Sequence, residues 1–200
     1  MKVPPVLKPT IVVFDFDGTL FNGDSLYYFI VNAIGKSGFY KAIMKNLFNI
    51  IRWKTGFISN SVAKERLFRS IFHGMDKQRF IALCNDFEKI IDSRINKEVV
   101  DLLKHHIEEG HQVYIVSASP SEWISPWAKK TGVKEVIGTR LEYSEEKLTG
   151  NFASPNCYGP EKVKRFLEVE PHRDDYELIS YGDSRGDREM FELSNRSVRV

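Results

Sequence analysis

The sequence predicts an α/β fold: a Rossmann-like parallel sheet flanked by helices, with an α-helical bundle inserted after the first strand. Four short runs of apolar and β-branched residues are typical of strands that are buried on both faces of a parallel sheet. They lie near Ile11, Val113, Val136 and Leu178, and segments with helical periodicity separate them. The 200 residues, 42% of them hydrophobic, suffice for one such core and a small accessory domain.

The long segment between the first two strands has a helical pattern. The pattern breaks near residues 35–38, 55–56 and 73–76. The helices predicted between these breaks cover residues 25–36, 39–54, 60–72 and 76–91, lengths that are typical of a bundle. We therefore expect residues 24–93 to form a helical cap domain and residues 1–23 and 94–200 to form the catalytic core.

Helices and strands are expected to alternate after the cap. The predicted elements are a helix over 96–109, a strand over 113–116, a helix over 122–130, a short strand over 133–137, and two strands over 139–152. Gly110 ends the first of these helices. The turn in the strand pair is expected around Ser144-Glu145-Glu146, and a last strand begins near Ser197, where the sequence stops.

Composition narrows the class of protein. The net charge of +2 does not indicate nucleic-acid binding. Cys84 and Cys157 lack the spacing of metal ligands, which argues against a zinc site or a disulfide framework. No apolar run approaches the ~20 residues of a membrane-spanning helix. We therefore expect a soluble, cytoplasmic protein.

Asp15 and Asp17 directly follow the first apolar run. Two carboxylates at the end of a buried strand need a cation or hydrogen-bond donors to compensate them, which indicates a functional site. A structural alternative is that the pair only ends the strand and begins a turn, as Asp-Gly often does.

Three further polar signals occur downstream. Ser117 follows the strand at 113–116, Lys162 lies in the first turn of a predicted helix, and Asp183 and Asp187 follow the last buried strand. In an open α/β sheet, ligands bind beyond the carboxyl ends of the strands. All of these signals therefore point to one site.

The ordered set resembles the four-motif signature of the haloacid dehalogenase-like (HAD) hydrolase superfamily: Asp-Phe-Asp-Gly-Thr, then a Ser, then a helix-borne Lys, then Gly-Asp-Ser-x-x-Asp. The insertion is similar to that of the phosphoserine phosphatase-like branch (subfamily IB), whose helical cap occupies this position. The resemblance covers nearly the whole chain, with the cap matched by location and helical character. It implies phosphatase activity, because family members whose phospho-enzyme must persist generally lack an acid at the position of Asp17.

These motifs imply roles for the residues. Asp15 is the candidate nucleophile, which forms an aspartyl-phosphate, and Asp17 the candidate general acid and base. Asp15, Asp183 and the backbone carbonyl of Asp17 would hold Mg²⁺, which prefers a few carboxylates plus waters. Asp187 is expected behind them, orienting Lys162 or a metal-bound water.

The phosphoryl group would be held by Ser117, Lys162 and backbone amides near Gly18 and Ala118. Two roles stay open for four further residues: contact with the substrate, or a structural role in a loop or helix cap. These residues are Thr19, Ser119, Ser184 and Arg185. Asp24 corresponds to the acidic residue that binds the substrate amino group in the resembling phosphoserine phosphatases, but it also suits a helix N-cap.

The predicted helix from Phe39 to Lys54 has more apolar residues than one packed face needs, and basic residues lie beside them. From Ser25 through Lys64 the sequence has no acidic residue. Three interpretations stay open: a plain bundle helix, a cap that attracts an anionic substrate, and an interfacial helix that makes peripheral contact with an anionic membrane.

The sequence thus predicts a Mg²⁺-dependent phosphomonoester hydrolase for a small phosphorylated metabolite, phosphoserine-like or similar. An alternative is a phospholipid headgroup phosphatase, such as a phosphatidylglycerophosphatase, at the membrane surface. A metal-dependent nuclease would need more carboxylates and a basic groove across the core. A non-catalytic binding module would be expected to have lost motif residues, and all of them are present.

Overall fold

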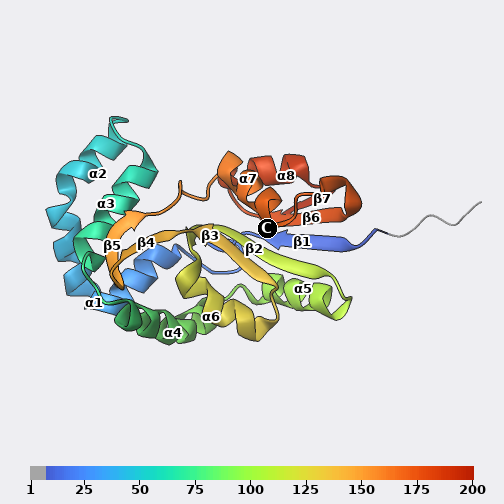
Figure 1. Cartoon of the computed structure of the whole chain (residues 1–200), viewed down its shortest axis with the longest axis horizontal. Helices are drawn as coiled ribbons and strands as arrows, with labels where there is room; N and C mark the ends of the chain where they lie inside the picture. The colour runs from blue at the N-terminus through green and yellow to red at the C-terminus, as the bar shows by residue number, and fades with distance from the viewer. Residues whose placement is uncertain (1–7) are drawn as a thin grey trace, which may run out of the picture.

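The computed structural model describes residues 8–200, which form a five-stranded parallel sheet with helices on both faces (Figure 1). The strand order is β3-β2-β1-β6-β7, so the first strand lies at the centre. The strands are β1 (Thr10–Phe14), β2 (Gln112–Pro120), β3 (Glu135–Thr139), β6 (Glu177–Gly182) and β7 (Arg196–Arg199). This arrangement confirms the predicted α/β fold and the last strand.

Both faces of the sheet are buried, as the continuous apolar runs predict. In β1, Ile11 and Val13 contribute to one apolar cluster, while Val12 and Phe14 contribute to the other. The first cluster lies under α7 (Pro160–Val169) and α8 (Arg188–Leu193). The second lies under α5 (Lys97–Glu108) and α6 (Ser121–Thr131), on the opposite side in Figure 1. Two short 3₁₀ helices flank β6, at Arg173–Asp175 and Arg185–Asp187.

Four helices follow β1 and lie at one end of the sheet (Figure 1). They are α1 (Ser25–Lys45), α2 (Leu47–Lys54), α3 (Asn60–Phe72) and α4 (Lys77–Arg94). The predicted break near residue 35 is a kink inside α1, because Gly35 adopts a φ of 73° and a ψ of 165° that only glycine tolerates well.

The single helix predicted from Phe39 to Lys54 is wrong: the chain breaks at Asn46. The Asn46 side chain donates to Ala42 O at 2.9 Å and to Ser70 Oγ of α3 at 2.8 Å. Asparagine side chains compete with backbone groups for hydrogen bonds, which disfavours helix interiors. The residues after Asn46 therefore begin a separate helix, α2, which lies against α3.

The predicted strand pair forms a hairpin, β4 (Leu141–Ser144) and β5 (Lys147–Phe152). This hairpin packs on the inserted helices instead of joining the main sheet (Figure 1). Gly74 N–H donates to Leu148 O at 2.7 Å, and Leu148 N–H donates to Met75 O at 2.9 Å. The inserted helices are thus bonded to a hairpin that comes much later in the sequence.

An aromatic core joins the inserted helices to the sheet. Phe29 of α1 stacks on Trp123 of α6, with ring centroids 4.6 Å apart, and it also contacts Phe72, Phe80 and Phe87. All of these side chains are fully buried. Trp123 therefore serves core packing. Among residues 8–200, no helix combines the length and apolarity needed to cross a membrane.

Candidate active site

The loop after β1 brings its carboxylates to the carboxyl edge of the sheet. The Asp15 N–H donates to Tyr181 O of β6 at 2.9 Å, which fixes the strand end. Gly18 then turns the chain with a φ of +82°. A Cβ atom at Gly18 would collide with the Asp183 carboxylate, so glycine lets the two loops approach closely.

Lys162 connects two of the predicted site carboxylates. Its Nζ donates to Oδ1 of Asp15 and to Oδ1 of Asp187, both at 2.6 Å. The helix α7 begins with Pro160 at its first position, which suits a proline, and this start directs Lys162 into the site. All three side chains are buried, so the ammonium group compensates carboxylates that would otherwise be costly to bury.

The surroundings shift the pKa values of this group. Burial raises the pKa of Asp15 to about 7, although the nearby Lys162 ammonium opposes the shift. Burial alone would lower the pKa of Lys162, but Asp15 and Asp187 outweigh it, so the pKa of Lys162 is raised. The lysine therefore stays charged at neutral pH, as a phosphoryl-binding group must.

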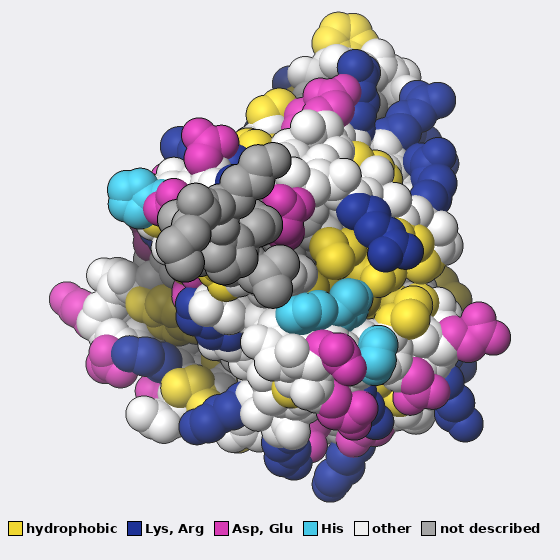
Figure 2. Space-filling view, turned by 90° about the vertical axis from the view of Figure 1, so that its right-hand side faces the viewer, with side chains coloured by type: hydrophobic (Ala, Val, Ile, Leu, Met, Phe, Trp, Pro, Cys, Tyr) yellow, Lys and Arg dark blue, Asp and Glu magenta, His cyan; other side chains and the backbone are white. Residues whose placement is uncertain are grey.

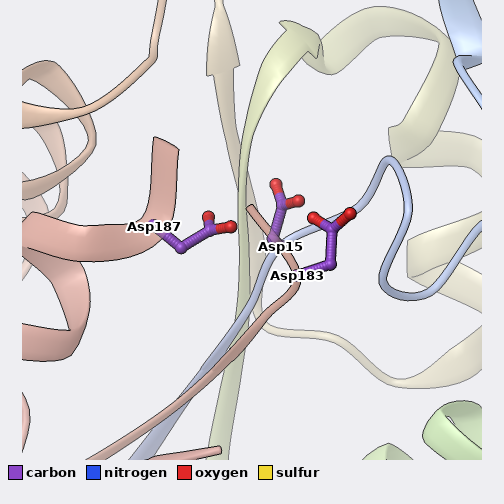
Figure 3. A group of neighbouring side chains, drawn as sticks. All are labelled: Asp15, Asp183 and Asp187. Carbon is purple, nitrogen blue, oxygen red and sulfur yellow. The ribbon is translucent and has the colours of Figure 1, made fainter. Parts of the chain in front are cut away.

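Asp15, Asp183 and Asp187 face a common space (Figure 3), with one carboxylate oxygen of each within 4.8 Å of the others. Both oxygens of Asp187 are engaged, because Oδ1 accepts from Lys162 and Oδ2 accepts from Ser184 N–H and Oγ. Asp183 Oδ1 is buried and has no hydrogen-bond partner among residues 8–200. An orphaned carboxylate oxygen facing Asp15 fits a hard divalent cation.

Asp17 lies beside this group with its own partners. Its Oδ1 accepts from Ser25 N–H at 2.7 Å and its Oδ2 accepts from Ser119 Oγ at 2.5 Å. Burial and the neighbouring Asp24 raise the pKa of Asp17, while the bonds from Ser119 and Ser25 lower it. A carboxyl group with a raised pKa can hold a proton for donation.

A pocket of about 360 Å³ collects these side chains. From the set predicted by sequence, it is lined by Asp15, Asp17, Gly18, Asp24, Ser117, Ala118, Lys162, Asp183 and Ser184. The motifs therefore meet in space although they are spread over most of the chain.

Four predicted residues do not line the pocket. Two of them, Ser119 and Asp187, contact lining residues through their bonds with Asp17 and Lys162. Thr19 is fully buried beneath the loop and does not line it. Arg185 is exposed and lines a separate groove near Arg199. Asp24 is the N-cap of α1, since its Oδ1 accepts from Leu26 N–H at 3.0 Å, and it lines the pocket as well.

Sequence reasoning missed five lining residues: Gly23 of the loop before α1, Asn60 and Lys64 of α3, and Asn156 and Tyr158 of the loop before α7. Lys64 lies at the end of the acid-free basic stretch, which is a weak signal. Asn156 and Tyr158 follow the hairpin and carry no motif. Only the packing of the hairpin and α3 brings the side chains of the last four to the site.

The fold and this cluster define a hydrolase with an acidic centre at the carboxyl edge of a parallel sheet. A family model for haloacid dehalogenase-like hydrolases matches residues 12–192. The chain therefore belongs to that family, as the motifs predict. Within it the chain is similar to proteins named phosphoserine phosphatases.

Three similar proteins illustrate the relationship. Phosphoserine phosphatase SerB1 of Mycobacterium tuberculosis is 24% identical, over 100% of this chain and 67% of its own. A Bordetella pertussis protein of unknown function superposes with a TM-score of 0.82 and is 23% identical, over 96% of this chain and 90% of its own. A phosphoserine phosphatase solved as a phospho-aspartyl intermediate analogue superposes with a TM-score of 0.59 and is 18% identical, over 96% of this chain and 86% of its own.

Proposed function

We propose that this chain is a Mg²⁺-dependent phosphomonoesterase that acts through an aspartyl-phosphate. The observation that carries the proposal is the bridge from Lys162 to Asp15 and Asp187, beside the unpartnered Asp183 oxygen. Such a site combines a nucleophile with groups that neutralise a phosphoryl dianion.

In the first half-reaction, the Asp15 carboxylate attacks phosphorus and the bond from phosphorus to the alcohol oxygen breaks. Asp17 gives its proton to that oxygen, which its raised pKa favours. In the second half-reaction, Asp17 takes a proton from water as the water oxygen attacks phosphorus. The bond to Asp15 then breaks, which releases inorganic phosphate and restores the Asp15 carboxylate.

The remaining site residues hold the phosphoryl group. Lys162, the Ser117 hydroxyl and the amides near Gly18 and Ala118 line the pocket or border it, and they supply donors for its oxygens. Asp15, Asp183 and the Asp17 carbonyl would hold Mg²⁺, which when bound neutralises phosphoryl charge. Asp187 keeps Lys162 in place through their 2.6 Å contact.

The substrate in this proposal is a small phosphorylated metabolite. Asp24 and Lys64 offer opposite charges on the wall of the pocket, which suits a phosphoserine-like alcohol. The likeness to SerB1 supports this substrate class. We also propose that residues 24–93 act as a cap that excludes water when it closes and releases product when it opens.

The test is phosphate release by the purified protein with Mg²⁺, with and without chelator. The panel includes phosphoserine, sugar phosphates, histidinol phosphate, nucleotides and phosphatidylglycerophosphate vesicles. Acid quenching with labelled substrate should trap a hydroxylamine-sensitive phospho-enzyme on Asp15. Metal-independent release, or a phospho-enzyme on another residue, would contradict the mechanism.

A second candidate function is hydrolysis of a phospholipid headgroup at an anionic membrane. Exposed apolar side chains on α1 and α2 favour it: Tyr40, Met44, Phe48 and Ile51 are each more than half exposed. Lys41, Lys45 and Arg52 lie among them in the sequence. Apolar and basic side chains together are typical of interfacial helices.

A further inference from the structure

A second hollow lies between the inserted helices. It is a groove of about 430 Å³, within the range of small-molecule pockets. Its apolar lining comes from α1, α2 and α3: Leu26, Tyr27, Ile30, Phe39, Ile43 and Trp53, among others. The kink at Gly35 folds the second part of α1 back, so that residues from before and after the kink line the same groove.

The groove continues into the phosphoryl pocket. Asp24, Asn60 and Lys64 line both hollows. Of the residues in 8–200 that line the groove, Asp24 and Lys64 alone are charged, so the charge lies at the shared end. A molecule bound across the junction would thus place a polar group toward Asp15 and an apolar group between the helices.

Lys64 supplies the cationic group at the junction. Asp24 carries the opposite charge there and also caps α1, since its Oδ1 accepts from Leu26 N–H and Tyr27 N–H. Lys64 has no ion-pair partner in the described part of the chain, and no acidic residue occurs between Ser25 and Lys64. The shared end therefore complements a phosphate ester approaching the site.

The apolar walls of the groove are not closed over by the protein. Tyr40 is 64% exposed and Trp53 is 39% exposed, although both line it. Contiguous exposed apolar surface of this kind marks a binding groove in a folded protein. Its continuity with the phosphoryl pocket indicates that the occupant is part of the substrate.

We propose that the groove binds the aliphatic chain of the alcohol, so that the substrate class is a phosphomonoester of an amphiphilic alcohol. The proposal rests on the proposed phosphatase activity, and it assigns the substrate to alcohols with an aliphatic chain in place of the phosphoserine-like class. In this arrangement the phosphoryl group lies at Asp15 and Lys162. The aliphatic chain of the alcohol lies along Ile43 and Trp53, and Lys64 faces the junction between the two.

The test is a series of soluble alkyl phosphates from ethyl to hexyl, all below their micelle-forming concentration. Each buried methylene should raise kcat/KM about three- to fourfold, or roughly a hundredfold over the series. Ala63→Phe narrows the groove and should reduce the hexyl-to-ethyl ratio to near one. Ala82→Phe makes the same change at an exposed position of α4, and should keep the ratio of the unmodified protein.

A binding measurement separates this inference from the phosphatase proposal. Hexylphosphonate should shift the fluorescence of Trp53 to the blue, whereas ethylphosphonate should not, and Trp53→Phe should remove the response. The other tryptophans, Trp123 and Trp127, are buried and serve as an unresponsive background. This fluorescence measurement does not depend on hydrolysis. If no ester is hydrolysed, only the phosphatase proposal is contradicted.

Two results would overturn the inference. One is a flat chain-length profile with active short esters and no Trp53 response, in which case the phosphatase proposal would stand. The other is a dimer by light scattering that Ala63→Phe dissociates, again without a Trp53 response, because the groove would then hold a second copy of the chain.

Discussion

The Nζ atom of Lys162 lies 2.6 Å from Oδ1 of Asp15, although the two residues are 147 positions apart in the sequence. Lys162 comes from the first turn of α7 and Asp15 from the end of the central strand. The contact joins the group that would bind the phosphoryl oxygens to the group that would attack phosphorus. The predictions below begin from this pair.

Asp15→Asn should abolish turnover, with a loss of at least about 10³-fold, because an amide is neither a nucleophile toward phosphorus nor a strong ligand for a divalent cation. The measurement is phosphate release under saturating Mg²⁺. Beryllofluoride, which mimics an aspartyl-phosphate, should raise the melting temperature of the unmodified protein and not that of the variant. Asp101→Asn, at an exposed position of α5, is the matched control. Substantial residual hydrolysis would remove Asp15 as the nucleophile.

Lys162→Met should destabilise the fold by about 3–5 kcal/mol at pH 8, because Asp15 and Asp187 lose their buried cation. Without the ammonium, burial should hold the folded-state pKa of Asp15 above its unfolded value. The folded state then binds more protons, so the deficit should shrink as pH falls toward 5. Urea unfolding at several pH values measures this.

The double variant Lys162→Met/Asp187→Asn provides the control for Lys162→Met. It removes one of the two uncompensated charges, so the double variant should recover part of the lost stability. A Lys162→Met protein as stable as the unmodified one at pH 8 would show that the bridge carries no energetic weight.

Asp17→Asn should slow turnover by about 10²–10⁴-fold through lost acid-base catalysis. Ser119→Ala should have a milder and different effect. Because the bond from Ser119 Oγ lowers the pKa of Asp17, its loss should raise that pKa. The limb of the kcat profile that Asp17 sets, basic where it donates a proton and acidic where it accepts one, should therefore move to higher pH. An unmoved profile would count against the role of Asp17.

Histidines gather at the end of the molecule shown in Figure 2. His106 contacts His111 through their Nδ1 atoms at 2.9 Å, and its Nε2 lies 2.9 Å from the Tyr181 hydroxyl. Burial and the neighbouring histidines lower the pKa of His106. Below about pH 6.5 His106 is therefore protonated to a greater extent in the unfolded chain than in the folded one, and its contribution to stability should fall as pH falls.

His106→Gln should weaken this pH dependence between pH 7.5 and 5.5, because glutamine does not titrate and keeps a polar group near Tyr181. Thermal unfolding across that range is the measurement. His172→Gln changes an exposed histidine and should leave the dependence as it is. If the stability of the His106→Gln variant changes with pH as steeply as that of the unmodified protein, His106 is not the source of the pH dependence.

Vesicle binding tests the membrane candidate. Replacing Lys41, Lys45 and Arg52 by glutamine should weaken cosedimentation with anionic vesicles by about 100-fold, at about 1 kcal/mol for each cation. The same change at Lys89, Lys97 and Lys129, which are exposed elsewhere, should have little effect. If the unmodified protein does not bind vesicles, the lipid-surface function is wrong.

Local sequence determined the fold class and the residues that can carry the chemistry. Continuous apolar runs such as Ile11 to Phe14 predict strands buried on both faces, because alternating side chains of a parallel strand point into two cores. Acidic and hydroxyl residues directly after such strands must lie at the carboxyl edge. The motif residues were predictable for this reason.

Only the tertiary structure decided which groups meet. The contact of Lys162 with Asp187 depends on how α7 packs over the sheet, and Asn60 and Lys64 reach the site because α3 packs against the hairpin. Likewise, the break at Asn46 depends on its bond to Ser70 of another helix. Such contacts join residues far apart in the sequence, and periodicity and local propensity carry no information about them. The groove beside the site, formed where kinked α1 meets α2 and α3, is decided in the same way.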